Sequence, residues 1–169
     1  MRSLINAFVL AACLFLPMNG IADESAKDFG FQLYDTNDRL ISLNKVLEEP
    51  GTKMVIVDFF SMACAPCKRS MPRLAELASK LHPKGLRVVI VAVPAGEEKG
   101  ADLERIKRFF EPLNVSFPIV FDKYSVVAKK YGVTENGSAK LPQSFVIDAK
   151  GSLQGRFTDM DSLVKFVDE

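Results

Sequence analysis

The chain has 169 residues, of which 48% are hydrophobic and 25% are charged, a balance that is ordinary for a globular domain with its own core. Its formal net charge is +1, so no strong surface field points to nucleic acid as a partner. The sequence shows no internal repeat, low-complexity tract or interdomain linker. We therefore expect one folded domain.

The N-terminal segment has the pattern of a secretory signal peptide. Arg2 gives a positive start, residues 4–16 form an apolar stretch, and small residues lead to a cleavage site after Ala22. The apolar stretch is shorter than the ~20 residues that a membrane-spanning helix needs. We predict a signal peptide at 1–22 and a mature domain at 23–169. This domain would be periplasmic or otherwise extracytoplasmic, where disulfides persist.

A lipid anchor is a second interpretation of the same segment. Residues 10–13, with the sequence LAAC, resemble a bacterial lipoprotein box, which would make Cys13 the lipidated N-terminus. Against this interpretation, the chain stays apolar beyond Cys13 as far as Leu16. Both interpretations place the mature protein outside the cytoplasm.

Predicted strands and helices alternate along the rest of the chain. Apolar residues alternate with polar ones at 29–33 and return at 40–43, which predicts a two-stranded N-terminal ribbon. Near-continuous apolar runs or short alternating runs predict strands at 54–60, 86–93, 117–121, 144–147 and 153–157. Apolar residues at helical spacing predict helices at 64–81, 101–110, 125–131 and 159–167. This order predicts an α/β domain with a central sheet flanked by helices.

The motif Cys64-Ala65-Pro66-Cys67 lies where the first long strand gives way to a helix. Two cysteines at this spacing can close a small disulfide, with the first cysteine near the N-terminus of the helix. The unpaired N–H groups and the positive dipole end favour a thiolate there. Since the thiolate is the species that attacks disulfides, this position suits thiol–disulfide exchange.

Other uses of the two cysteines remain open from the residues alone. Tetrahedral zinc needs about four ligands, and only Cys13 and His82 are left to complete such a site. A purely structural disulfide across this spacing closes too short a loop to stabilise the fold much. A copper-binding or metallochaperone module is the main alternative, because Met62 and Met71 flank the cysteines, and thioethers with thiolates suit Cu(I).

Two segments of the chain resemble the thioredoxin-fold family. Residues 57–67, VDFFSMACAPC, resemble its active-site strand and turn, and residues 141–148, LPQSFVID, resemble its cis-proline loop and hairpin. The 75 positions between Cys67 and Pro142 leave room for an additional strand–helix unit, which we place at 86–110. This insert, the N-terminal ribbon and the signal peptide together resemble the TlpA/ResA branch of thiol–disulfide oxidoreductases. The implied fold is thioredoxin-like, with a central mixed sheet.

The resemblance implies a role for each residue that matches the two motifs. Cys64 would be the exposed attacking thiol and Cys67 the buried resolving thiol. Asp58 takes the place of the family's buried acid, where its carboxylate can accept the proton of the resolving thiol and where burial raises its pKa. Pro142 would be cis and would lie beside the disulfide. The implied substrate-binding residues are Pro142, Leu141, Ala65 and Pro66.

We expect a monomeric redox enzyme that needs no cofactor. Its substrates would be protein disulfides, apocytochrome c among them, and a membrane thiol reductase would supply its electrons. We expect the protein to act as a reductant, with disulfide oxidation or isomerisation as a variant of the same chemistry. A peroxiredoxin is a weaker match, because no Thr precedes Cys64 at that family's spacing. The loop at 134–140 is a candidate part of a partner site.

Overall fold

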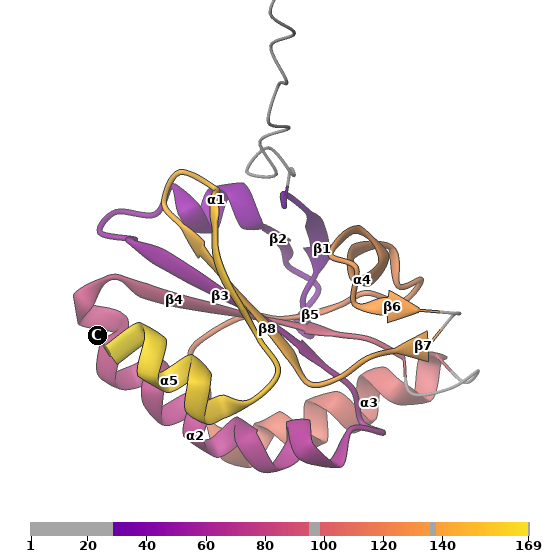
Figure 1. The fold of residues 1–169 in the computed structure, drawn as a ribbon. Helices are drawn as coiled ribbons and strands as arrows, with labels where there is room; N and C mark the ends of the chain where they lie inside the picture. The colour runs from indigo at the N-terminus through magenta and orange to yellow at the C-terminus, as the bar shows by residue number, and fades with distance from the viewer. Residues whose placement is uncertain (1–28, 95–98, 136–137, 169) are drawn as a thin grey trace, which may run out of the picture.

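The computed structural model describes residues 29–94, 99–135 and 138–168, and it contains a central five-stranded sheet (Figure 1). Its strands are β3 (Met54–Phe60), β4 (Leu86–Ala92), β5 (Ile119–Phe121), β8 (Gln143–Asp148) and β9 (Leu153–Phe157). They lie side by side in the order β5-β4-β3-β8-β9. β3 and β5 run parallel to β4, whereas β8 runs antiparallel to both β3 and β9. The predicted mixed sheet is therefore confirmed.

The middle strand, β3, is buried on both of its faces. Val57 and Phe59 point to one side, and Ile56 and Phe60 point to the other, all with 0% exposure. A strand covered on both faces reads as a continuous apolar run rather than as an alternating pattern. Because side chains alternate along a strand, Asp58 lies on the same face as Ile56 and Phe60. An acid is thereby placed inside the core.

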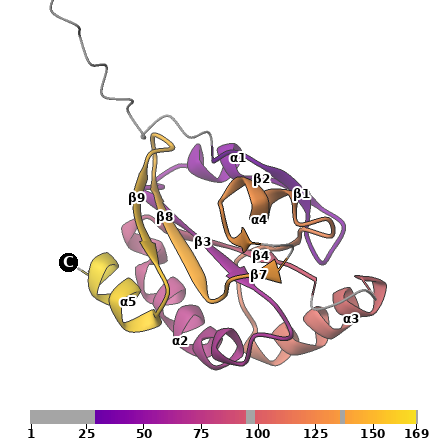
Figure 2. The ribbon, with the colours of Figure 1, turned by 45° about the vertical axis from the view of Figure 1, so that its right-hand side comes forward.

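Helices cover both faces of the sheet (Figures 1 and 2). The face of Ile56 and Phe60 carries α2 (Ala65–Leu81), α3 (Lys99–Phe110) and α5 (Met160–Asp168). The opposite face carries α1 (Leu43–Leu47), α4 (Val126–Lys130) and the ribbon of β1 (Gln32–Tyr34) and β2 (Leu40–Ser42). Single 3-10 turns follow two of the helices, η2 (His82–Lys84) and η3 (Glu111–Leu113). The arrangement is the predicted layered α/β domain.

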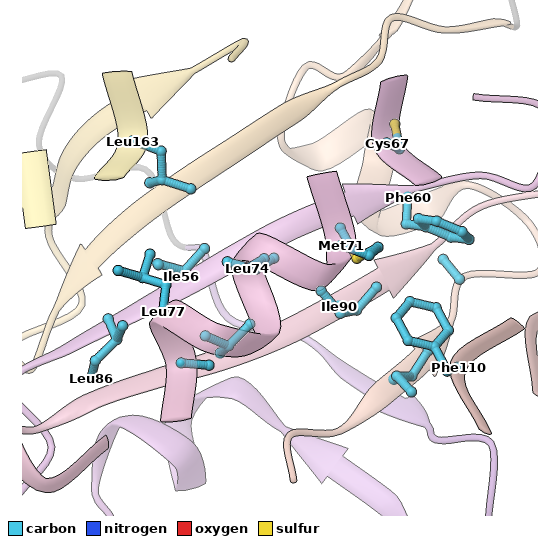
Figure 3. Packing of buried hydrophobic residues seen from close by; sticks show 14 of the residues in the cluster. Ile56, Phe60, Cys67, Met71, Leu74, Leu77, Leu86, Ile90, Phe110 and Leu163 are labelled. Atoms are coloured by element: carbon cyan, nitrogen blue, oxygen red, sulfur yellow. The ribbon is translucent and has the colours of Figure 1, made fainter. Parts of the chain in front are cut away.

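The helix α2 is fixed by an apolar stripe that faces the sheet (Figure 3). Met71, Leu74 and Leu77 recur at helical spacing and are 1%, 0% and 5% exposed. They pack in the same cluster as Ile56 and Phe60 of β3. This packing holds the first turn of α2 over the end of β3, where the cysteines lie.

The structure corrects the position of the additional strand–helix unit. We placed this unit at 86–110, but β4 pairs with β3 over all seven of its residues and belongs to the β3–α2–β4 unit around the cysteines. The additional strand is instead β5, which lies next to β4 at the edge of the sheet, and the chain reaches it through α3. The predicted loop at 134–140 also differs, because it contains a second small ribbon of β6 (Thr134–Glu135) and β7 (Ser138–Ala139).

The predicted signal peptide at 1–22 and the alternative anchor residue Cys13 lie outside the described residues. Both therefore stay predictions. Within the described part of the chain, the helices are too short or too polar to cross a bilayer.

Candidate active site

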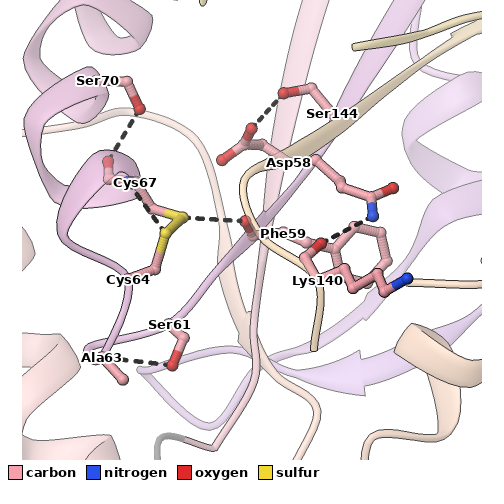
Figure 4. Close-up of a disulfide and its surroundings, with 10 residues drawn as sticks. Asp58, Phe59, Ser61, Ala63, Cys64, Cys67, Ser70, Lys140 and Ser144 are labelled. Atoms are coloured by element: carbon pink, nitrogen blue, oxygen red, sulfur yellow. Dashed lines mark hydrogen bonds between the residues drawn. A yellow bond between two sulfur atoms is a disulfide. The ribbon is translucent and has the colours of Figure 1, made fainter. Parts of the chain in front are cut away.

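The cysteines of the CxxC motif form a disulfide at the start of α2 (Figure 4), with 2.05 Å between the sulfur atoms and 5.3 Å between the Cα atoms. β3 ends at Phe60, and the N–H of Cys64 donates to the carbonyl oxygen of Ser61 at 2.9 Å, which closes the turn into the helix. Pro66 lies in the first turn of α2, where its missing N–H leaves no helical bond unmade. The local sequence thus places the disulfide at the carboxyl end of the middle strand, as predicted.

Cys64 is the N-cap residue of α2. The N–H of Cys67 donates to the Sγ atom of Cys64 at 3.1 Å. After reduction, the same amide and the positive end of the helix dipole are in place to stabilise a thiolate on Cys64. The helix N-terminus therefore favours the charged form of the first cysteine.

The two sulfur atoms have different surroundings. Cys64 is 9% exposed and Cys67 is 1% exposed, which is the predicted order, although Cys64 is itself largely covered in the oxidised protein. Both cysteines belong to the core cluster that includes Met71, but only Cys67 is almost fully buried, with its Sγ atom 4.0 Å from the carbonyl oxygen of Phe59 (Figures 3 and 4). A substrate that approaches from solvent therefore meets Cys64 first.

Asp58 is a buried acid in β3, 4% exposed, on the face that α2 covers. Its neighbour across the sheet is Ser144 of β8, whose Oγ atom donates to Oδ1 of Asp58 at 2.5 Å (Figure 4). Burial raises the pKa of Asp58 from 3.8 to about 7, and the bond from Ser144 opposes this rise. An acid that titrates near neutral pH can both accept and release a proton there. The burial of Asp58 agrees with the predicted rise of its pKa.

The cis-proline loop lies next to the end of β3. The peptide bond between Leu141 and Pro142 is cis, which confirms the expectation from the motif. The loop leads into β8, and the pairing of Gln143 with Phe59 brings it to the carboxyl end of β3. Leu141 is partly buried and packs against the core clusters on both faces of the sheet.

An open cavity of about 770 Å³ lies beside the disulfide. Cys64, Ala65, Pro66 and Leu141 line it, but Cys67, Asp58 and Pro142 do not. The other walls are formed by residues 61 and 63 before the motif, 93–94 after β4, 123–125 after β5, and 138–139 of β7. Three of the predicted substrate-binding residues thus face one cavity, and Pro142 lies outside its lining.

Sequence reasoning did not find the cavity walls at 93–94 and 123–125, or the partner of Asp58. A signal for the walls was available, because β3, β4 and β5 are parallel and the carboxyl ends of parallel strands converge at one edge of a sheet. Residues directly after β4 and β5 were therefore candidates for this site. Ser144 carries no such signal, because its place opposite Asp58 depends on the register of two strands.

The side chains considered for a metal site lie apart along the chain: Met62 precedes α2, Met71 lies within it and His82 follows it. Among the described residues, no group of three or more His, Cys, Asp and Glu side chains is arranged to hold a metal ion. Met71 is 1% exposed and fills the core, and Met62 is partly buried against the same cluster. His82 follows the C-terminus of α2, at the end of the helix away from the cysteines.

A disulfide at the start of the helix that follows a middle strand, with a cis-proline loop alongside and a buried acid beneath, defines a thioredoxin-like protein. Solved structures share this fold. A putative thiol:disulfide interchange protein DsbE from Chlorobium tepidum is similar with a TM-score of 0.66 and 23% identity, covering 82% of this chain and 88% of that one. A secreted disulfide oxidoreductase from Mycobacterium tuberculosis has a TM-score of 0.66 and 17% identity, covering 85% and 98%.

The chain belongs to the AhpC/TSA family, whose sequence pattern matches residues 22–156. Curated relatives include the thiol-disulfide oxidoreductase ResA of Bacillus thuringiensis subsp. konkukian, 36% identical over 101 residues, which are 60% of this chain and 52% of that protein. ResA of Bacillus subtilis is 33% identical over 123 residues, 73% of this chain and 60% of that protein. The chain thus spans little more than half the length of these relatives.

Proposed function

We propose that this protein is a thiol–disulfide oxidoreductase that exchanges the Cys64–Cys67 pair with protein disulfides. One observation carries the proposal: Cys64 accepts a hydrogen bond at the helix N-terminus and faces an open cavity, while Cys67 is buried behind it. The similarity to relatives named ResA thiol-disulfide oxidoreductase supports the same activity.

The reaction proceeds through a mixed disulfide. In the reduced protein the thiolate of Cys64 attacks one sulfur of the substrate disulfide, and the other substrate sulfur leaves and takes up a proton. Asp58, as a carboxylate, accepts the proton of Cys67. The Cys67 thiolate then attacks the sulfur of Cys64, which restores the internal disulfide and releases the second substrate sulfur as a thiolate that takes up a proton. Two electrons pass from the protein to the substrate.

We further propose that the protein works outside the cytoplasm as a monomeric reductant. The signal-peptide pattern at 1–22 supports the location, with Cys13 as the alternative lipid anchor. A membrane thiol reductase would return electrons to the pair. Apocytochrome c and other extracytoplasmic disulfide proteins are the proposed substrates, held against Ala65, Pro66 and Leu141 and guided by the cis-proline loop.

The reduction potential of the cysteine pair tests the proposed direction of electron flow. We expect a value nearer about −270 mV, typical of thioredoxin, than about −120 mV, typical of a strong oxidant. The protein is equilibrated in glutathione redox buffers, its thiols are trapped by alkylation, and the mass shift is read, because the chain has no Trp to report the change. A value above about −180 mV would contradict the role of reductant.

The copper-binding alternative predicts a different result when metal-free protein is tested. Stoichiometric Cu(I) binding in competition with a chelator, together with no reduction of protein disulfides, would favour it over the proposed activity. A protein that reduces disulfides and binds Cu(I) no better than the Cys64→Ser variant would exclude it.

A further inference from the structure

The turn between β5 and α4 contributes a cation to the cavity. Lys123, Tyr124 and Ser125 line the wall there, and Lys123 is the one charged side chain among the described lining residues. The other lining residues that the structure describes are uncharged, among them Ala65, Pro66 and the small residues of β7. The cavity beside Cys64 therefore has a positive, partly apolar wall.

This turn is held in place by a buried acid. Asp122 is 1% exposed, and its carboxylate accepts the N–H of Val126 at 2.9 Å and the N–H of Ala128 at 2.8 Å. Its own N–H donates to the carbonyl oxygen of Ala92 at 2.9 Å, which ties the turn to the end of β4. The backbone of the turn is thus fixed before a substrate arrives, and a preorganised element loses little entropy on binding.

Two side chains of this turn, Lys123 and Tyr124, are exposed to solvent. The Nζ atom of Lys123 lies 5.5 Å from the centroid of the Tyr124 ring, and Tyr124 is 65% exposed. Within the described part of the chain, no carboxylate forms an ion pair with Lys123. An exposed ammonium beside an exposed ring complements a carboxylate next to an apolar side chain.

Building on the proposed function, we infer that the cavity takes an extended protein segment in which an acidic residue flanks the reactive cystine. The carboxylate binds Lys123, and an adjacent apolar side chain packs on Tyr124. At about 770 Å³, the cavity has room for such neighbours as well as for the cystine sulfurs. Selection among protein disulfides then depends on residues next to the cystine as well as on the attacking thiolate.

Three peptides test the inference. They share one sequence, carry a Glu, Gln or Lys beside the cysteine, and present that cysteine as a disulfide to 2-thiopyridine. When Cys64 attacks the peptide sulfur, pyridine-2-thione leaves and is followed by its absorbance. With reduced wild-type protein at low salt, we expect the Glu peptide to react about three- to fivefold faster than the Gln peptide, and the Lys peptide to react slowest. High salt brings the three rates together, because it screens exposed charges.

Two variants assign the effect to the turn. Lys123→Glu is expected to reverse the preference between the Glu and Lys peptides. Lys84→Glu, an equal change at an exposed position of η2, is expected to leave it unchanged. If Lys123→Glu still reacts faster with the Glu peptide, the inference is wrong. It is also wrong if Lys123→Glu changes the rate with glutathione disulfide but none of the rates with the three peptides. If the Gln peptide reacts normally but charge has no effect, only this inference fails. If none of the peptides reacts with any variant, the proposed function fails as well.

Discussion

Cys67→Ser is expected to accumulate covalent adducts with its substrates. Cys64 has the helix N-terminus and the cavity beside it, so it still attacks a substrate disulfide. Serine does not attack the resulting mixed disulfide, because a hydroxyl is a far weaker nucleophile than a thiolate at neutral pH. The adducts are visible on a non-reducing gel of an extract from the native compartment, and mass spectrometry identifies the captured proteins.

Cys64→Ser is the matched control, since it removes one sulfur from the same short loop. We expect few adducts and a rate of disulfide reduction no higher than that of the uncatalysed reaction, because Cys67 is 1% exposed and is absent from the cavity lining. Reduced wild-type protein serves as the reference for folding, because it also lacks the disulfide. Equal trapping by both variants would show that the two thiols have been assigned the wrong roles.

The elements that position the cysteines could be predicted from the sequence because their patterns are long. β3 has the predicted ends, since seven residues of nearly continuous apolar character allow few alternatives. α2 begins at the motif and ends where predicted, because its stripe of Met71, Leu74 and Leu77 repeats through the helix. By contrast, the strands of the ribbon at 134–139 are two residues long, too short to show alternation.

The parts of the site that the sequence did not predict depend on how distant segments meet. Ser144 bonds to Asp58 only in the observed register, and a shift by one residue would turn its side chain to the other face of the sheet. Lys123 lies far from the motif in sequence and reaches the cavity because β5 is parallel to β4 and ends at the same edge. Neither the bond between Ser144 and Asp58 nor the position of Lys123 in the cavity wall can be predicted from a short stretch of sequence. The cis bond before Pro142 was expected only through the family resemblance.

Asp58→Asn is expected to make the oxidised protein more stable at alkaline pH. The folded-state pKa of Asp58 is about 7, compared with an ordinary value of 3.8. As the pH rises between these values, the unfolded chain loses a proton that the folded chain keeps, so the free energy of unfolding falls, by at most about 4 kcal/mol. Asparagine does not titrate and keeps an oxygen acceptor for Ser144. Urea unfolding followed by circular dichroism should show a gain of up to about 4 kcal/mol above about pH 8 and little difference near about pH 4.

The same substitution is expected to slow the second chemical step, although it stabilises the fold. If Asp58 accepts the proton of Cys67, the release of a preformed mixed disulfide on Cys64 slows by about 10²-fold near pH 7, and its dependence on a group with a pKa near 7 disappears. Ser144→Ala separates proton transfer from packing. It removes the bond that lowers the pKa of Asp58, so the midpoint of the pH profile moves upward while the acid remains. Identical pH profiles for wild type, Asp58→Asn and Ser144→Ala would show that Asp58 accepts no proton in this reaction.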